Sequence, residues 1–176
     1  MSVIWATSRY GNTSISANRE NRHAGFTIVE LLVTVVIVSI LASAAFPMAE
    51  LAAQRTREQE LRRGLSEIRE ALDAYKQAVD EGKVRRPADA SGYPPSLEVL
   101  VKGEVDAKDP KGRKIYFLRR VPRDPFFADA SVPAAGTWGI RSYASSADDP
   151  KEGDDVYDVY STSIGTGLNG IPYREW

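Results

Sequence analysis

The chain has 176 residues, of which 43% are hydrophobic and 27% charged, and its formal net charge is -1. This balance creates no overall field that would attract nucleic acid, so we expect no nucleic-acid partner. Cysteine is absent and His23 is the single histidine, which excludes disulfides, thiolate chemistry, histidine triads and multi-histidine metal sites.

Residues 1–25 are polar and show no apolar periodicity. Arg9, Arg19 and Arg22 outnumber the one acid, Glu20. Because positive charge flanking an apolar segment stays in the cytoplasm, this leader is predicted to be cytoplasmic. The rest of the chain is then predicted to lie outside the cytoplasm.

An apolar stretch follows from Phe26 to Ala49, and Glu30 is its only charge. A helix of about 24 residues is roughly 36 Å long, enough to cross a hydrocarbon core of about 30 Å. A carboxylate within such a segment costs about 2.5–3.5 kcal/mol on insertion scales. A plain anchor has no reason to carry this cost.

Two general interpretations of the stretch are a cleaved secretory signal and a stop-transfer anchor. Ala42-Ser43-Ala44 offers an A-x-A cleavage site, but the stretch is long for a signal and Glu30 interrupts its start. An anchor fits the length and leaves Glu30 unexplained.

A third interpretation comes from a resemblance. The string Gly25-Phe26-Thr27-Ile28-Val29-Glu30 resembles the prepilin processing motif of type IV pilins and type II secretion pseudopilins. In that family the leader ends in Gly, the next residue becomes the methylated N-terminus of the mature chain, and Glu stands fifth. Here these positions are Gly25, Phe26 and Glu30, and Pro47 stands where pilins commonly carry a helix-kinking proline.

The resemblance implies that prepilin peptidase cleaves after Gly25 and that the Phe26 amine is methylated. Glu30 can then pair with the Phe26 amine of a neighbouring subunit in the apolar filament core, where a mispaired charge is costly. The alternative is that Glu30 lies at the membrane interface, close to the edge of the segment.

The helix is predicted to continue to about Glu81, with a kink at Pro47 and a stop at Gly82. Its apolar stripe has spacings of 4, 3, 4, 3 and 4 residues and consists of Leu61, Leu65, Ile68, Leu72, Tyr75 and Val79. The charges between them predict a solvated face with i,i+4 pairs. Gly64 within it costs about 1 kcal/mol relative to alanine.

Seven prolines divide residues 82–136, so only one short helix, over residues 96–101, is predicted there. The segments Tyr93–Leu97 and Val121–Phe126 are similar to the connecting segment of G-type pseudopilins. The basic cluster Lys111–Lys114, with Arg119 and Arg120, is interpreted as a solvated loop, with contact to an acidic partner as the alternative.

Residues 137–145 and 155–161 are predicted to be antiparallel strands, because aromatic and β-branched residues partly alternate in them. The glycine-rich string 165–170 lacks the Lys-Ser/Thr of a P-loop and is predicted to be a turn.

Calcium is the one cofactor that the resemblance raises. G-type pseudopilins bind it through acids in the loop after the last strand, but residues 161–169 contain no carboxylate here. We therefore expect no cofactor. The alternative is a calcium site built from the acids around the predicted hairpin, which are Asp148, Asp149, Glu152, Asp154, Asp155 and Asp158.

Together these features predict an α+β, type IV pilin-like fold, with a long N-terminal helix packed on a small antiparallel sheet. The predicted parts are a cleaved leader (1–25), a transmembrane and assembly helix (26–49) and a periplasmic domain (50–176). The domain divides into an amphipathic helix (50–81), a connecting segment (82–136), and a sheet with a C-terminal loop (137–176).

The resemblance implies a pseudopilin that is not an enzyme and that polymerises from the bacterial inner membrane into a short periplasmic filament for type II protein secretion. Its implied partners are prepilin peptidase, other pseudopilin subunits and the inner-membrane assembly platform. Two alternatives stay open: a type IV pilus pilin, although the C-terminal cysteine pair of many pilins is missing, and a single-pass anchored binding domain that never polymerises.

Overall fold

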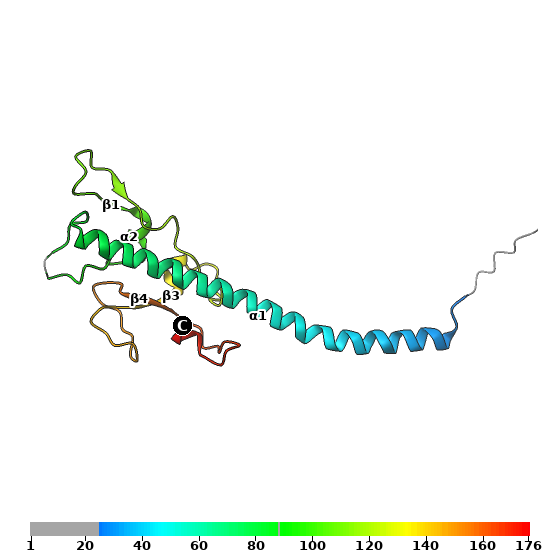
Figure 1. Ribbon diagram of the computed structural model, residues 1–176. Coiled ribbons are helices and arrows are strands. Elements are labelled where there is room, and N and C mark those ends of the chain that lie inside the picture. The colour runs from blue at the N-terminus through cyan, green and yellow to red at the C-terminus, as the bar shows by residue number, and fades with distance from the viewer. Residues whose placement is uncertain (1–24, 88) are drawn as a thin grey trace, which may run out of the picture. The chain divides into compact units, whose positions relative to one another are not determined.

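The structure is a computed structural model that describes residues 25–87 and 89–176. Of the predicted leader, all but Gly25 lies outside these residues. The chain divides into two compact units, residues 1–44 and 45–176, and each is described by itself. One long helix, α1 (Ile28–Asp80), contributes to both units (Figure 1).

In the first unit, α1 carries the apolar stretch predicted from the sequence. Large apolar side chains are exposed from its first turn onwards, with Ile28 80% and Val38 62% accessible. Among the described residues, α1 is the one helix that is long and apolar enough, by length and composition, to cross a membrane. This surface therefore needs lipid or other protein to cover it.

The helical hydrogen bonding of α1 runs on past Pro47, which lies inside the helix. Proline removes one main-chain donor from the ladder. The predicted kink at Pro47 stays a prediction.

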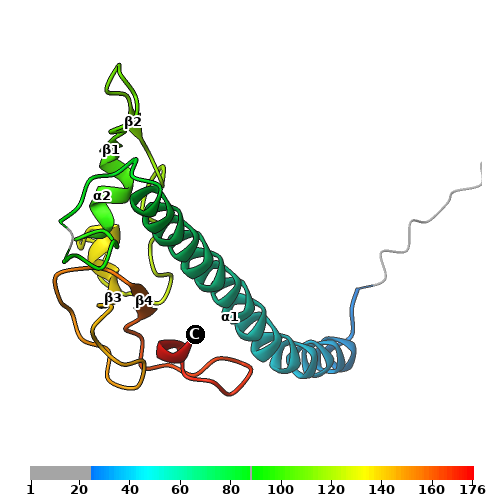
Figure 2. The same ribbon diagram turned by 60° about the vertical axis from the view of Figure 1, so that its left-hand side comes forward.

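In the second unit, the predicted stripe of α1 is confirmed as the core. Leu61, Leu65, Ile68, Leu72 and Tyr75 are all at most 2% accessible, and Val79 packs against them, partly buried. Figure 2 shows β3 (Trp138–Arg141), β4 (Asp158–Ser161) and the C-terminal turn beside this part of α1. The side chains that complete the core come from these elements and from α2 (Leu97–Lys102), and include Leu97, Leu100, Trp138, Val159 and Tyr173.

Gly64 has a packing reason that the sequence did not reveal. A Cβ atom at this position would lie 3.2 Å from two ring carbons of Trp138, and the indole Nε1 donates to the Pro122 carbonyl at 2.8 Å. The missing side chain lets the six-membered ring of the tryptophan approach α1 closely. The cost of a glycine within the helix is offset by the burial of a large aromatic ring.

The C-terminus of α1 is a Schellman motif, and Gly82 ends the helix as predicted. Gly82 has φ 70°, its N–H donates to the Val79 carbonyl, and the Lys83 N–H donates to the Ala78 carbonyl, both at 2.8 Å. Glycine adopts this left-handed conformation without steric cost.

The connecting segment holds the predicted short helix, α2 (Leu97–Lys102). It also holds a small hairpin that was not predicted, β1 (Glu104–Val105) paired antiparallel with β2 (Lys114–Ile115). The interpretation of Lys111–Lys114 as loop is therefore wrong at Lys114. Strands of two residues are too short to produce a hydrophobic alternation.

The second sheet pairs β3 (Trp138–Arg141) antiparallel with β4 (Asp158–Ser161). Both strands are shorter than predicted. Over the described residues, the strands thus form two sheets of two strands each in place of one sheet, and the α+β class is confirmed. The short 3-10 helices η1 (Ala134–Thr137) and η2 (Tyr173–Glu175) complete the elements.

The charges of α1 are predicted from the sequence to form a solvated face with i,i+4 pairs. Within the described residues, the ion pair Lys76–Asp80 is the one such pair on the helix. Arg69 instead pairs with Asp158 on β4, at 2.8 Å. The ion pair of Arg69 thus joins α1 to β4 and does not link two residues of the helix.

We expect the substitutions Leu65→Ala and Leu72→Ala each to lower the free energy of unfolding by about 2–5 kcal/mol, because both remove buried methyl groups from a packed core. Denaturant melts of the full chain in detergent measure this loss. Gln59→Ala, on the exposed face of the same helix, is the control. A loss below about 0.5 kcal/mol at both leucines, the range of surface substitutions, would show that the stripe does not support the fold.

Candidate functional site

The first turn of α1 is built by a local sequence signature, Thr27-Ile28-Val29-Glu30. The Thr27 hydroxyl accepts a hydrogen bond from the Glu30 N–H at 3.1 Å, and the Thr27 carbonyl accepts the first helical bond, from the Leu31 N–H at 3.0 Å. Thr27 is therefore the N-cap and Glu30 occupies the third helical position. This is the spacing of a capping box.

Glu30 thus has a local reason for its position, which our sequence reasoning missed although the T-x-x-E pattern signals it. A carboxylate in the first turn is favoured by the positive end of the helix dipole. Within the described residues, its carboxylate forms no ion pair. Its charge is available to a cation from outside this unit.

The hydroxyl groups of the apolar stretch are satisfied within the helix. Thr34 donates to the Leu31 carbonyl at 2.9 Å, Ser39 to Val35 at 2.7 Å and Ser43 to Ile40 at 2.8 Å. These bonds let the side chains enter hydrocarbon at little cost. Glu30 is then the polar side chain of this stretch that still requires a partner.

The peptide bond between Gly25 and Phe26 lies before the helix begins. Residues 25–27 have no regular secondary structure, and Gly25 and Phe26 are exposed. A Cβ atom at Gly25 would have nothing within 4 Å. The structure itself therefore does not require glycine at this position.

A second set of polar residues lies in the second unit, residues 45–176, which we call the head. In it, Glu58 is 7% accessible. Its Oε1 atom accepts hydrogen bonds from Gln54 Nε2 at 3.1 Å, from the Leu168 N–H at 2.8 Å and from the Tyr173 hydroxyl at 3.0 Å. Burial raises the pKa of Tyr173; the hydrogen bond from Gln54 lowers it, and Glu58 raises it further. Sequence reasoning missed Glu58, although it lies three residues before Leu61 and so extends the stripe.

Asp124 is a second buried carboxylate, at the start of the Asp124-Pro125 turn. It is 1% accessible, accepts from the Ser161 hydroxyl at 2.6 Å and from the Phe126 N–H at 2.8 Å, and its own N–H donates to Thr137 Oγ1 at 3.1 Å. It ties the Asp-Pro turn to the end of β4. These bonds supply the donors that a buried carboxylate needs.

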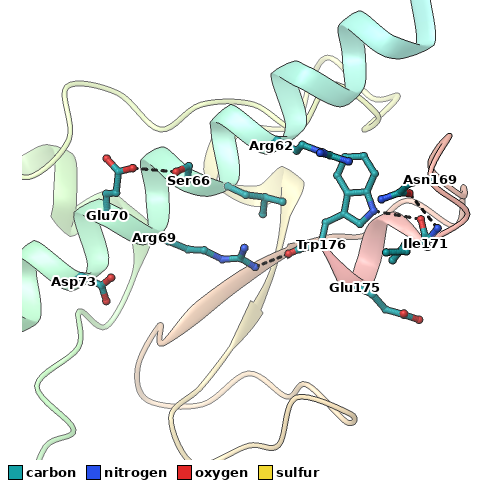
Figure 3. A pocket seen from close by; sticks show the side chains of 10 residues that line it. Arg62, Ser66, Arg69, Glu70, Asp73, Asn169, Ile171, Glu175 and Trp176 are labelled. Atoms are coloured by element: carbon teal, nitrogen blue, oxygen red, sulfur yellow. Dashed lines mark hydrogen bonds between the residues drawn. The ribbon is translucent and has the colours of Figure 1, made fainter. Parts of the chain in front are cut away.

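The C-terminal residues and α1 border an open groove of about 480 Å³, shown in Figure 3. The Arg62 guanidinium lies over the Trp176 ring, 4.3 Å from its centroid, and Arg69 donates to the Trp176 main-chain oxygen at 2.9 Å. Both arginines fasten the C-terminal residue to α1.

Two of the acids predicted as alternative calcium ligands have other partners. Asp158 pairs with Arg69 and with Arg141, the latter at 3.0 Å, and Asp155 accepts from the Tyr143 N–H at 2.8 Å. Across residues 25–87 and 89–176, no three acidic or histidine side chains are grouped so that they could hold a metal ion.

Comparisons with known proteins match both the N-terminal segment and most of the chain. The family model described as "Prokaryotic N-terminal methylation motif" matches residues 21–46, which include Gly25, Phe26 and Glu30. The type II secretion system core protein G of Pseudomonas aeruginosa is 30% identical over 139 residues, which cover 77% of this chain and 90% of the relative.

The chain belongs to the family of type II secretion system core protein G. Core protein G of Klebsiella pneumoniae is 30% identical over 144 residues, 77% of this chain and 93% of the relative. That of Dickeya chrysanthemi is 28% identical over 155 residues, 85% and 93%. The resemblance drawn from the sequence is thereby confirmed. No solved structure is significantly similar to the chain.

The Thr27 cap should stabilise the first turn of α1. We expect Thr27→Val to destabilise the turn by about 1 kcal/mol, because valine cannot accept the Glu30 N–H. Amide exchange of Glu30, measured by NMR in detergent micelles, should become roughly fivefold faster, and Thr27→Ser should behave as the unmodified chain. Equal exchange in both variants would contradict the cap.

Proposed function

We propose that the chain is a prepilin that is cleaved after Gly25, and that the mature protein beginning at Phe26 assembles as the major pseudopilin of a type II secretion system. The observation that carries the proposal is the joint position of three features. A matched methylation motif, an exposed apolar helix beginning two residues after the Gly25-Phe26 bond, and a family relationship that extends through the head all occur in one chain.

The proposed cleavage is supported by the local backbone. A peptidase acts on an extended strand of substrate, and residues 25–27 are outside the helix while α1 begins at Ile28. Because Gly25 has no structural neighbour that demands its small size, we assign the requirement for glycine to the active site of the peptidase. The products are a leader that ends at Gly25 and a new ammonium group at Phe26, which in this proposal is then methylated.

Assembly follows from the balance of charges that cleavage creates. The mature chain has one positive group at Phe26 and one negative group at Glu30, both at the start of the apolar helix. When such helices pack together and exclude water, each charge needs a partner, because an unpaired buried charge costs several kcal/mol. Pairing Glu30 of one subunit with the Phe26 amine of its neighbour neutralises both and sets the axial register.

The head contributes a scaffold to the proposed filament. We infer that the leader is cytoplasmic, that α1 crosses the bacterial inner membrane and that the head lies in the periplasm, since the arginines precede the apolar stretch. The partners that follow are prepilin peptidase, further copies of this chain and the inner-membrane assembly platform. The chain acts in this proposal as a structural subunit.

Replacing Gly25 with leucine is expected to block removal of the leader, because the larger side chain prevents close approach of the peptidase to the backbone. Mass spectrometry of protein from cells that contain prepilin peptidase measures the N-terminus. The unmodified chain should begin with N-methylated Phe26, and the Gly25→Leu variant should keep its leader. The same mature mass from both proteins would overturn the assignment of the cleavage site.

Replacing Glu30 with valine is expected to leave cleavage and membrane insertion intact and to abolish assembly. Insertion gains at most about 2.5–3.5 kcal/mol, whereas the unpaired Phe26 ammonium in the filament core costs about 3–5 kcal/mol. Crosslinking of intact cells and electron microscopy of sheared filaments report assembly.

Glu50→Gln, which removes an exposed carboxylate just beyond the apolar stretch, is the matched control and should assemble normally. If the Glu30→Val chain forms oligomers as the unmodified chain does, Glu30 is an interfacial residue and the anchored binding domain becomes the better account.

A further inference from the structure

We propose that the Glu58 carboxylate, and not a metal ion, fastens the C-terminal segment, residues 162–176, to α1. The resemblance to G-type pseudopilins implies a calcium ion bound in the loop after the last strand. The proposal therefore sets this chain apart within its family. It concerns the head alone and does not depend on processing or assembly.

The first argument is the convergence of donors on one buried oxygen. Glu58 Oε1 accepts from two groups of the C-terminal segment, the Leu168 N–H at 2.8 Å and the Tyr173 hydroxyl at 3.0 Å. The third donor, Gln54, lies one turn earlier on α1, with its Nε2 at 3.1 Å. Hydrogen bonds to a charged group are about twice as strong as neutral ones, and more so where water is excluded.

The second argument is that the residues present do not fit calcium. The ion takes six to eight oxygen ligands, several of them carboxylates, whereas residues 162–176 contain one carboxylate side chain, Glu175, which is exposed. Two side-chain oxygens of the loop already accept hydrogen bonds from the main chain: Asn169 Oδ1 from the Ile171 N–H at 3.1 Å and Ser163 Oγ from the Gly165 N–H at 3.3 Å.

The groups that face Glu58 have the wrong polarity for a cation. They are an amide N–H, a main-chain N–H and a phenol O–H, and each presents hydrogen to the carboxylate. A calcium site gathers oxygens around a positive centre, whereas here a negative centre gathers hydrogens. We infer that the same segment is fastened by the opposite charge arrangement.

The packing around the carboxylate is consistent with a fastened segment. The Tyr173 ring stacks on Phe126 with centroids 4.1 Å apart and meets Trp176 edge-on at 5.1 Å. Gly167 permits this arrangement, since a Cβ atom there would lie 2.4 Å from the Trp176 ring. Loss of the Glu58 bonds would therefore release the turn over residues 165–170 and loosen the aromatic stack.

Hydrogen–deuterium exchange of the full chain in detergent, followed over peptides from residues 162–176, tests the proposal. In the unmodified chain, we expect the same exchange and the same Tm in EDTA and in about 10 mM calcium, which exceeds the Kd of extracellular calcium modules roughly ten- to a hundredfold. Glu58→Ala should accelerate exchange in this segment about tenfold or more, since it removes several hydrogen bonds to a charge.

Glu60→Ala is the matched control, because Glu60 is an exposed acid two residues further along the same helix. This substitution should leave exchange unchanged. Glu58→Gln keeps the size and one acceptor oxygen and should show a smaller acceleration. If Glu58→Ala does not fold, the comparison of Glu58→Gln with Glu60→Gln decides in its place.

Two results would overturn the proposal. One is slower exchange in residues 162–176, or a higher Tm, on addition of calcium to the unmodified chain. The other is equal exchange in the Glu58 and Glu60 variants, which would mean that packing of Tyr173 and Trp176 alone holds the segment.

Discussion

The apolar surface of α1 has to be covered in two different surroundings, and the rest of the molecule depends on this requirement. From Ile28 to Leu41 its large apolar side chains are exposed, so they can be covered only by lipid or by other protein. From Leu61 onwards the apolar residues keep to one stripe, which the short helices, hairpins and loops of the head cover. The head has little regular structure of its own, and its core is arranged around this stripe.

Carboxylates within or beside apolar surroundings mark the places where one arrangement of neighbouring segments is selected over others. Glu58 and Asp124 are buried in the head, and each receives several hydrogen bonds from neighbouring segments. They join the C-terminal segment and the Asp-Pro turn to the core, where an apolar contact would not select one arrangement. Glu30 differs because its partner is proposed to come from a neighbouring subunit. In each case the cost of an unpaired charge selects one geometry over its alternatives.

Several features of this chain could be read from the sequence because they are periodic or local. The stripe from Leu61 to Val79 and the stop at Gly82 depend on neighbours within a few residues, and the structure confirms both. The processing motif is likewise local, and the family relationship supports it. The hairpin β1–β2 was missed because two-residue strands leave no pattern, and the two sheets were predicted as one because sequence does not reveal which strand edges meet.

The sequence by itself determined the α+β class and the apolar helix with its single charge, since these follow from composition and spacing. The short motif over residues 25–30 carried the resemblance to pseudopilins, which the family relationship then confirmed. The tertiary structure alone decided the roles of Gly64 and Glu58. Gly64 is small because the Trp138 ring, which lies 74 residues further along the chain, packs against it. Glu58 is buried because donors from Leu168 and Tyr173 reach it. Contacts between residues this far apart depend on how the chain packs, and no local pattern encodes them.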